Sequence, residues 1–260
     1  MKKIIQIIPH LITSGNLFCG CLAIINVLAG DLIMAAYLVG LAAFLDFFDG
    51  FAARALGVSG EFGKQLDSLA DCVTFGVVPG MVMMVLIERS FVLESANLTP
   101  TEPQPCNQIP YLFIYPAHFA SYLALLVPVF SAIRLAKFNL DTRQSHAFIG
   151  LPTPANSIFM ISLGYLAAAQ TSDAATKNLI LNLWFLIPVT LIFSFLLVAE
   201  LPLFALKFKT YKWAGNEIRY LFLITSVLLL ILLKMTGLPV IILVYIAFST
   251  IENLLQKKKT

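Results

Sequence analysis

The sequence predicts an all-α protein that crosses a lipid bilayer several times, and its composition and the lengths of its apolar runs both support this. The chain has 260 residues, of which 59% are hydrophobic and only 12% are charged, and its mean hydropathy is +0.89. This composition excludes an ordinary soluble domain and a disordered chain. A bilayer core about 30 Å thick requires roughly 20 apolar residues per helix, so the chain can form six to eight spans.

Apolar runs between charged and turn-forming residues predict eight helices in one compact polytopic bundle, a single membrane-embedded domain over residues 1–260. The fifth, seventh and eighth runs are the shortest, and only Gly237-Leu238-Pro239 separates the last two, so six or seven spans also remain possible. The expected helices cover residues 10–30, 32–56, 65–88, 111–136, 154–170, 178–199, 217–234 and 238–254.

The lysines and arginines predict the orientation, because basic residues are retained on the cytoplasmic side of a membrane. Eight spans with both termini in the cytoplasm place all but three of the 17 basic residues on that side. The exceptions are Arg89, Lys177 and Lys234. This distribution concentrates positive charge against one leaflet, so membrane lipid, and no nucleic acid, is the expected partner.

Two segments between the apolar runs are expected to lie outside the bilayer core. Residues 91–110 contain four prolines, which predicts an irregular external loop. Residues 201–220 interleave lysines with aromatic side chains, which fits either an interfacial segment or a basic cytoplasmic loop.

Four aspartates lie around the turn between the expected second and third helices. Asp46 and Asp49 are three residues apart, and Asp67 and Asp71 are four apart, so the members of each pair share a helix face. A short turn with three glycines joins the two helices on the cytoplasmic side, which allows the faces to point at each other. The spacing therefore predicts that four carboxylates converge in one pocket.

Four ionised carboxylates in or near a membrane require compensating charge, because each is costly when unpaired and they repel one another. Arg54 and Lys64 supply only two positive charges, whereas two divalent cations balance all four carboxylates and prefer oxygen ligands. The residues thus predict two Mg²⁺ or Mn²⁺ ions, and a metal pair suits phosphoryl transfer. The small residues Gly50 and Ala53 would let a nucleotide or diphosphate approach the helix, with Arg54 pairing with a phosphate.

Two other interpretations of the aspartates are an intramembrane ion-pair network and a divalent-cation transporter. A transporter would more plausibly spread its acidic residues along a path or across symmetric halves. Here all four aspartates fall within 26 residues, between Asp46 and Asp71, around a single turn. This clustering favours an enzyme.

The same residues match the signature of the CDP-alcohol phosphatidyltransferase family, which is D-x2-D-G-x2-A-R, an eight-residue spacer, and then G-x3-D-x3-D. The chain resembles this family at every fixed position of the motif. These positions are Asp46, Asp49, Gly50, Ala53, Arg54, Gly63, Asp67 and Asp71.

The resemblance implies a role for each motif residue. Asp46, Asp49 and Asp67 would bind one metal ion, Asp67 and Asp71 would share the second, and Asp71 would be the general base. The opening Pro9, Thr13, Asn16 and Gly20 also resembles the P-x3-T-x2-N-x3-G of the family's first helix, although a polar contact between helices explains it nearly as well. The residues expected to hold the CDP-lipid are Thr13, Asn16, Gly50, Ala53, Arg54, Gly63 and Lys64. Lys64 is outside the motif, and a positive-inside lysine is the alternative for it.

Two later segments bear on the acceptor alcohol. IRLAKFNLD at residues 133–141 and FIGLPTPAN at 148–156 resemble RLARFN and F-x-GLP-x-P-A of the phosphatidylserine synthases, a group within the family. Arg134 and Lys137 suit a serine carboxylate and Asn139 could add a hydrogen bond, although a positive-inside anchor is the alternative.

The resemblance as a whole implies transfer of a phosphatidyl group from CDP-diacylglycerol to L-serine, with release of CMP. Glycerol 3-phosphate or an inositol phosphate remains possible as acceptor. The catalytic core would cover about residues 9–156, with additional spans over 154–254. The resemblance further implies a homodimer. A bacterial-type inner membrane is the expected location, and the distribution of basic residues predicts that the active site faces the cytoplasm.

Overall fold

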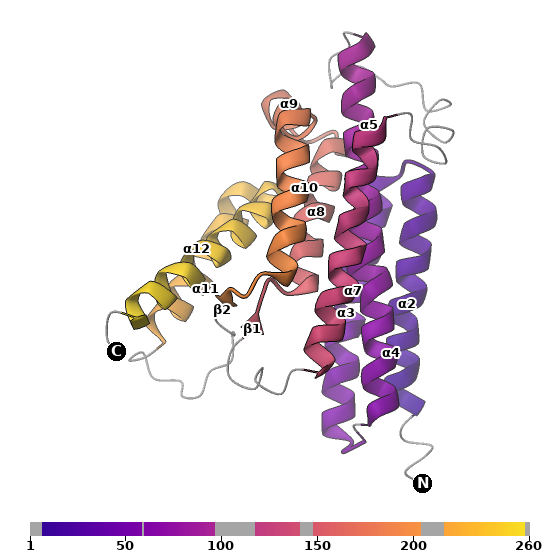
Figure 1. Cartoon of the computed structure of the whole chain (residues 1–260), viewed down its shortest axis with the longest axis vertical. Helices are drawn as coiled ribbons and strands as arrows, with labels where there is room; N and C mark the ends of the chain where they lie inside the picture. Colours follow the sequence, from indigo (N-terminus) through magenta and orange to yellow (C-terminus); the bar gives the residue numbers. More distant parts are fainter. Residues whose placement is uncertain (1–6, 59, 97–117, 141–147, 204–215, 258–260) are drawn as a thin grey trace.

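The computed structural model describes residues 7–58, 60–96, 118–140, 148–203 and 216–257, and these residues fold almost entirely into helices. Most helices run side by side as a bundle, and the last two lean away from it at an angle (Figure 1). The helices are α2 (Ile7–Leu28), α3 (Leu32–Ala55), α4 (Glu61–Asp71), η1 (Cys72–Val77), α5 (Val78–Ala96), η2 (Phe119–Leu125), α7 (Leu126–Leu140), α8 (Thr153–Ala168), α9 (Ala174–Ile180), α10 (Leu183–Val198), α11 (Glu217–Leu233), η4 (Lys234–Thr236) and α12 (Gly237–Lys257).

Five helical stretches of the described chain are long and apolar enough to cross a membrane, and the bent pair α9 and α10 makes a sixth if it counts as one span. The prediction of an all-helical membrane bundle is therefore confirmed. One of the five stretches, Glu217–Asn253, contains both α11 and α12, which fold back on each other through η4 (Figure 1). The break falls at Lys234, whose φ is +51°, and Gly237 already begins α12.

The expected boundaries differ from the structure where local geometry interrupts an apolar run. The third run is one continuous rod made of α4, the π-helical η1 and α5. The sixth run bends by 59° between α9 and α10, where the side chain of Asn182 caps α10 by accepting a hydrogen bond from Trp184 N. The expected loop at 91–110 was wrong at its start, because residues 91–96 continue α5, and the rest of it lies outside the described residues. Most of the basic segment at 201–220 lies outside them as well.

The core of the bundle lies around α5 and α8. Both helices are buried over most of their length, and Phe159 of α8 stacks on Phe193 of α10 with ring centroids 3.9 Å apart. Near the end of α5, the buried Glu88 accepts a hydrogen bond from the Ser121 hydroxyl at 2.5 Å and pairs with His118 Nδ1 at 3.0 Å. α3 packs on α8 and α2 packs on α5, so this core supports the helices next to the aspartates.

A two-residue antiparallel pair, β1 (Phe148–Ile149) with β2 (Pro202–Leu203), supports the start of α8. Gly150 follows β1 with a φ of +79°, and a Cβ there would lie 2.7 Å from the carbonyl oxygen of Leu197. The glycine therefore permits a close approach that fastens the first turn of α8 to the end of α10.

Replacing Gly150 with alanine should lower the free energy of unfolding by about 1–3 kcal/mol, because the left-handed φ and the overlap with Leu197 both add strain. The melting midpoint of the purified protein in detergent measures this. Gly40→Ala is the matched control, since a Cβ at Gly40 would meet nothing within 4 Å. Equal midpoints for the two variants would contradict the assigned role of Gly150.

Candidate active site

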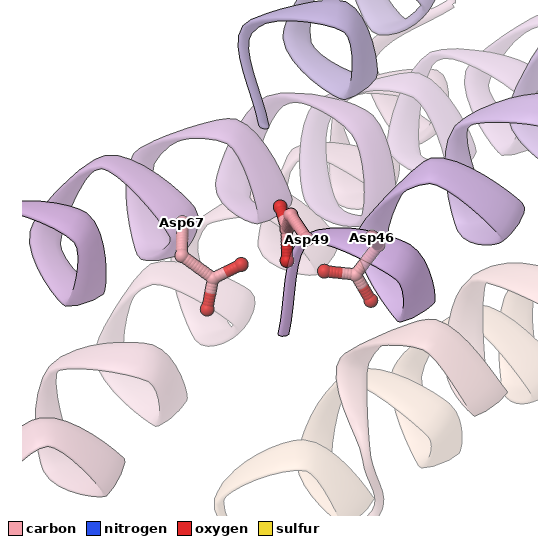
Figure 2. Close-up of side chains that lie close together, drawn as sticks. All are labelled: Asp46, Asp49 and Asp67. Atoms are coloured by element: carbon pink, nitrogen blue, oxygen red, sulfur yellow. The ribbon is translucent and has the colours of Figure 1, made fainter. Parts of the chain in front are cut away.

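The aspartates are positioned by the tight connection between α3 and α4. Asp46 and Asp49 lie on α3, and the chain reverses through Gly57, whose φ is +61°, before Asp67 on α4. One carboxylate oxygen from each of these three aspartates lies within 4.8 Å of the other two. Figure 2 shows their carboxylates facing one another from the two helices. The predicted convergence is therefore observed for these three residues.

Asp71 is not one of these three converging carboxylates, but it lies next to them. Its side chain is buried, and Asn16 Nδ2 donates a hydrogen bond to Asp71 Oδ1 at 3.3 Å. Asp71 is close enough to Asp46 and Asp67 for electrostatic interaction with both. All four predicted aspartates thus lie in one cluster. Asp71 is next to the three aspartates whose carboxylate oxygens are close enough together to bind one metal ion.

The donor set fits divalent cations. It consists of carboxylate oxygens alone, which Mg²⁺ and Mn²⁺ prefer. Among the residues that the structure describes, no lysine or arginine forms an ion pair with any of the four aspartates. Arg134 interacts with Asp71 without forming an ion pair, so one arginine cannot balance four carboxylates, and metal ions would supply the remaining positive charge.

Side chains on one face of α2 form hydrogen bonds with the aspartate cluster. The Thr13 hydroxyl donates to Asp49 Oδ2 at 2.6 Å, and Asn16 holds Asp71. One turn later, Gly20 lies directly against Thr74 of η1, whose hydroxyl donates to the carbonyl oxygen of Asn16 at 3.3 Å. Thr13 and Asn16 of the P-x3-T-x2-N-x3-G pattern therefore hold two of the carboxylates by hydrogen bonds. These bonds are polar contacts between helices, which was the alternative explanation of the pattern.

The π-helical η1 begins immediately after Asp71. Such short π-helical segments are rare and are often found at functional sites. Here the segment packs between α2 and α7, because Gly76 lies against Ser131 and Gly20 lies against Thr74. Asp71 therefore lies at the junction between α4 and the π-helical turn.

Replacing Gly20 with alanine should reduce both stability and activity. The new Cβ would overlap the Thr74 side chain and approach its Cα to 3.2 Å, so α2 and η1 must separate and move Asp71. We expect a loss of about 1–3 kcal/mol of folding free energy. Gly15→Ala on the same helix is the control, because its nearest neighbour is the flexible end of Leu45 at 3.3 Å. Unchanged turnover in Gly20→Ala would contradict this role.

A cavity of about 330 Å³ opens beside the cluster between α2, α3 and α4. It contains six of the seven residues predicted to hold the CDP-lipid, and Asn16 is the exception. The start of α4 faces it through Gly60 and Gly63, and a helix N-terminus favours a bound anion. The lining residues are Pro9, His10, Thr13, Asp49, Gly50, Ala53, Arg54, Val58, Gly60, Gly63, Lys64 and Asp67.

His10 is a lining residue that the sequence did not single out. Its ring lies in edge-to-face contact with Phe62, 5.1 Å between centroids, and a Cβ added at Gly63 would lie 3.1 Å from His10 Cε1. The histidine shows no ligand spacing in the sequence, so only its position beside the Pro9 motif could have indicated a place at the cavity.

The three residues predicted to bind the acceptor are separated in the structure. Arg134 is buried and its Nη1 donates to Thr153 Oγ1 at 2.9 Å, whereas Lys137 is exposed. Asn139 joins α7 to α4 instead. Its side-chain Nδ2 donates to Ser68 Oγ at 2.8 Å, and its backbone carbonyl oxygen accepts from Lys64 Nζ at 2.9 Å. Arg134 is close enough to Asp71 to interact with it electrostatically.

The sequence of this chain is similar to those of known proteins. A family model described as CDP-alcohol phosphatidyltransferase matches residues 6–196. A CDP-diacylglycerol--serine O-phosphatidyltransferase of Bacillus subtilis is 33% identical over 159 residues, which cover 61% of this chain and 75% of that protein. Proteins with the same description from Helicobacter pylori and Mycobacterium leprae are 29% and 30% identical.

The alignments to the Helicobacter and Mycobacterium proteins cover 60% and 76% of this chain and only 56% and 58% of those proteins. The chain thus spans little more than half the length of these two relatives. The family match itself covers α2 to most of α10, including all four aspartates and the cavity. The chain belongs to the CDP-alcohol phosphatidyltransferase family.

Proposed function

We propose that this membrane-embedded transferase moves the phosphatidyl group of CDP-diacylglycerol to L-serine, forming phosphatidylserine and CMP. The observation that carries the choice of acceptor is the buried Arg134 beside Asp71. One guanidinium suits one carboxylate. A phosphorylated acceptor would need more positive charge, and Lys137 points to the exterior. The descriptions of the relatives support the same acceptor.

The cavity provides the donor site. Its glycines and Ala53 leave room for the cytidine diphosphate next to the helix backbone, and Arg54 and Lys64 bring positive charge to its rim. The acyl chains would remain in lipid. The carboxylates of Asp46, Asp49, Asp67 and Asp71 would hold two Mg²⁺ or Mn²⁺ ions, which when bound supply charge stabilisation for phosphoryl transfer.

Asp71 is the proposed general base. It would accept the proton of the serine hydroxyl while that oxygen forms a bond to the lipid-side phosphorus and the bond from phosphorus to the CMP oxygen breaks. Asn16 orients Asp71 through the hydrogen bond to Oδ1, and Thr13 orients Asp49. Burial of Asp71 excludes water, which would otherwise compete with serine as the nucleophile.

The finer topology belongs to the same proposal. We propose eight crossings, with α8, α11 and α12 each counted as a span, and both termini and the aspartates facing the cytoplasm of a bacterial-type cell membrane. The distribution of basic residues supports this. The chain would be one catalytic domain with its core at about 9–156, and the homodimer implied by the family resemblance stays a prediction.

The proposal is tested by CMP release from purified protein in detergent with CDP-diacylglycerol and Mn²⁺ or Mg²⁺. L-serine, glycerol 3-phosphate and an inositol phosphate are compared as acceptors. Release that depends on serine supports the proposal, and release only with another acceptor contradicts the choice of serine while keeping the chemistry. Absence of release with every acceptor, together with nucleotide-independent cation flux in vesicles, would favour the transporter.

A further inference from the structure

A second group of buried polar side chains lies next to Asp71 and outside the cavity. We call it the Arg134 cluster; α7, α8 and α12 each contribute to it. The Arg134 guanidinium donates to Thr153 on α8 and is close enough to Tyr245 on α12 to interact with it electrostatically. The members of the cluster are Arg134, Thr153, Asn156, Tyr245 and Ser249, and each is at most 8% exposed.

Two side-chain atoms of this cluster are buried without a hydrogen-bond partner among the described residues. They are one donor, Nε of Arg134, and one acceptor, Oδ1 of Asn156. Leaving such atoms unpaired destabilises a protein, and native structures rarely do so without a ligand, ion or water. A buried cationic donor and a buried amide acceptor together suit a ligand that carries an anionic group and a hydrogen-bond donor.

The helix α12 places its side chains at this cluster by regular spacing. Ile242, Tyr245 and Ser249 are its buried residues in this region, separated by three and four positions, so they form one stripe. That helix packs on α8 and β2. The family match ends at residue 196, and α12 begins only at Gly237. The side chains that α12 contributes to the Arg134 cluster therefore come from a part of the chain outside the matched segment.

We propose that α12 completes the acceptor site, and that the hydroxyls of Tyr245 and Ser249 determine specificity for a zwitterionic amino alcohol. This inference rests on the proposed function. Arg134 would bind the carboxylate, Asn156 Oδ1 would accept from the ammonium group, and the hydroxyl of the ligand would face Asp71. Tyr245 would contact both Arg134 and the ligand, and Ser249, one helical turn further along the same face of α12, would contact the ligand beside Tyr245.

The test uses full-length Tyr245→Phe and Ser249→Ala in detergent, with KM measured separately for L-serine and for CDP-diacylglycerol. Loss of one hydrogen bond to the ligand should raise the KM for serine about tenfold. The KM for CDP-diacylglycerol and the kcat at saturating serine should stay within about twofold of wild type, because neither hydroxyl contacts the donor or the base. Tyr37→Phe is the control, since Tyr37 lies on an exposed face of α3.

The outcomes separate this inference from the proposed function. If the wild-type protein forms phosphatidylserine but both variants keep its KM for serine, the role of α12 is overturned and the proposed function stands. If Tyr245→Phe raises both KM values equally and lowers the melting midpoint, Tyr245 is structural and the inference fails. If the wild-type protein shows no serine-dependent reaction, the proposed function fails and the inference fails with it.

Discussion

Replacing Asp71 with asparagine should abolish CMP formation while the protein still folds. The variant keeps the volume of the side chain and an oxygen that can accept from Asn16 Nδ2, so the contact between α2 and α4 survives. It cannot take a proton from the acceptor. General bases typically contribute about 10²–10⁴-fold to the rate, so we expect turnover to fall by at least roughly a hundredfold.

The measurement is CMP release at saturating CDP-diacylglycerol and serine, together with the melting midpoint. Asp31→Asn is the matched control: Asp31 caps α3 by accepting from Met34 N at 2.9 Å, and asparagine is as good an N-cap. This control should keep both activity and midpoint. A turnover in Asp71→Asn within a few-fold of wild type would remove Asp71 from the role of base.

Metal removal should have an equally large effect. Chelation should eliminate CMP release, and added Mn²⁺ or Mg²⁺ should restore it, because the carboxylates of Asp46, Asp49 and Asp67 converge without a compensating lysine or arginine among the described residues. A ligand at a hundred times its Kd stabilises the folded state by about 2.7 kcal/mol, so the metal should also raise the melting midpoint.

Asp67→Asn distinguishes a bound metal from a general salt effect. Without metal, the variant should be at least as stable as the wild-type protein, because it removes one charge from a set of mutually repelling carboxylates. With metal, its midpoint should rise much less than that of the wild-type protein. An equal rise in both proteins, or wild-type activity in the presence of chelator, would argue against a metal site at these residues.

The sequence was sufficient to predict the aspartate cluster, because helix periodicity alone places Asp46 with Asp49 on one face and Asp67 with Asp71 on another. The short turn through Gly57 then leaves the two faces little freedom. Six residues predicted to hold the CDP-lipid, four of them from the family motif, also line one cavity. Local spacing therefore determined the part of the site that two adjacent helices form.

The parts that could not be predicted depend on contacts between distant segments. The π-helical η1 has the same apolar composition as the α-helix it interrupts, so no periodicity indicates it. The pairing of Asn16 with Asp71 joins residues 55 positions apart. The last hundred residues were expected to add little beyond spans, yet α12 brings Tyr245 to Arg134, because packing against α8 determines which face of α12 is buried.

The most direct test of the proposed chemistry follows isotopically labelled L-serine into lipid by mass spectrometry, with purified protein, CDP-diacylglycerol and Mn²⁺, while CMP is quantified in the same reaction. The four-aspartate site and the buried Arg134 predict labelled phosphatidylserine and CMP in equal amounts, and neither product in Asp71→Asn. CMP without labelled lipid, or labelled lipid formed by Asp71→Asn at the wild-type rate, would contradict this account.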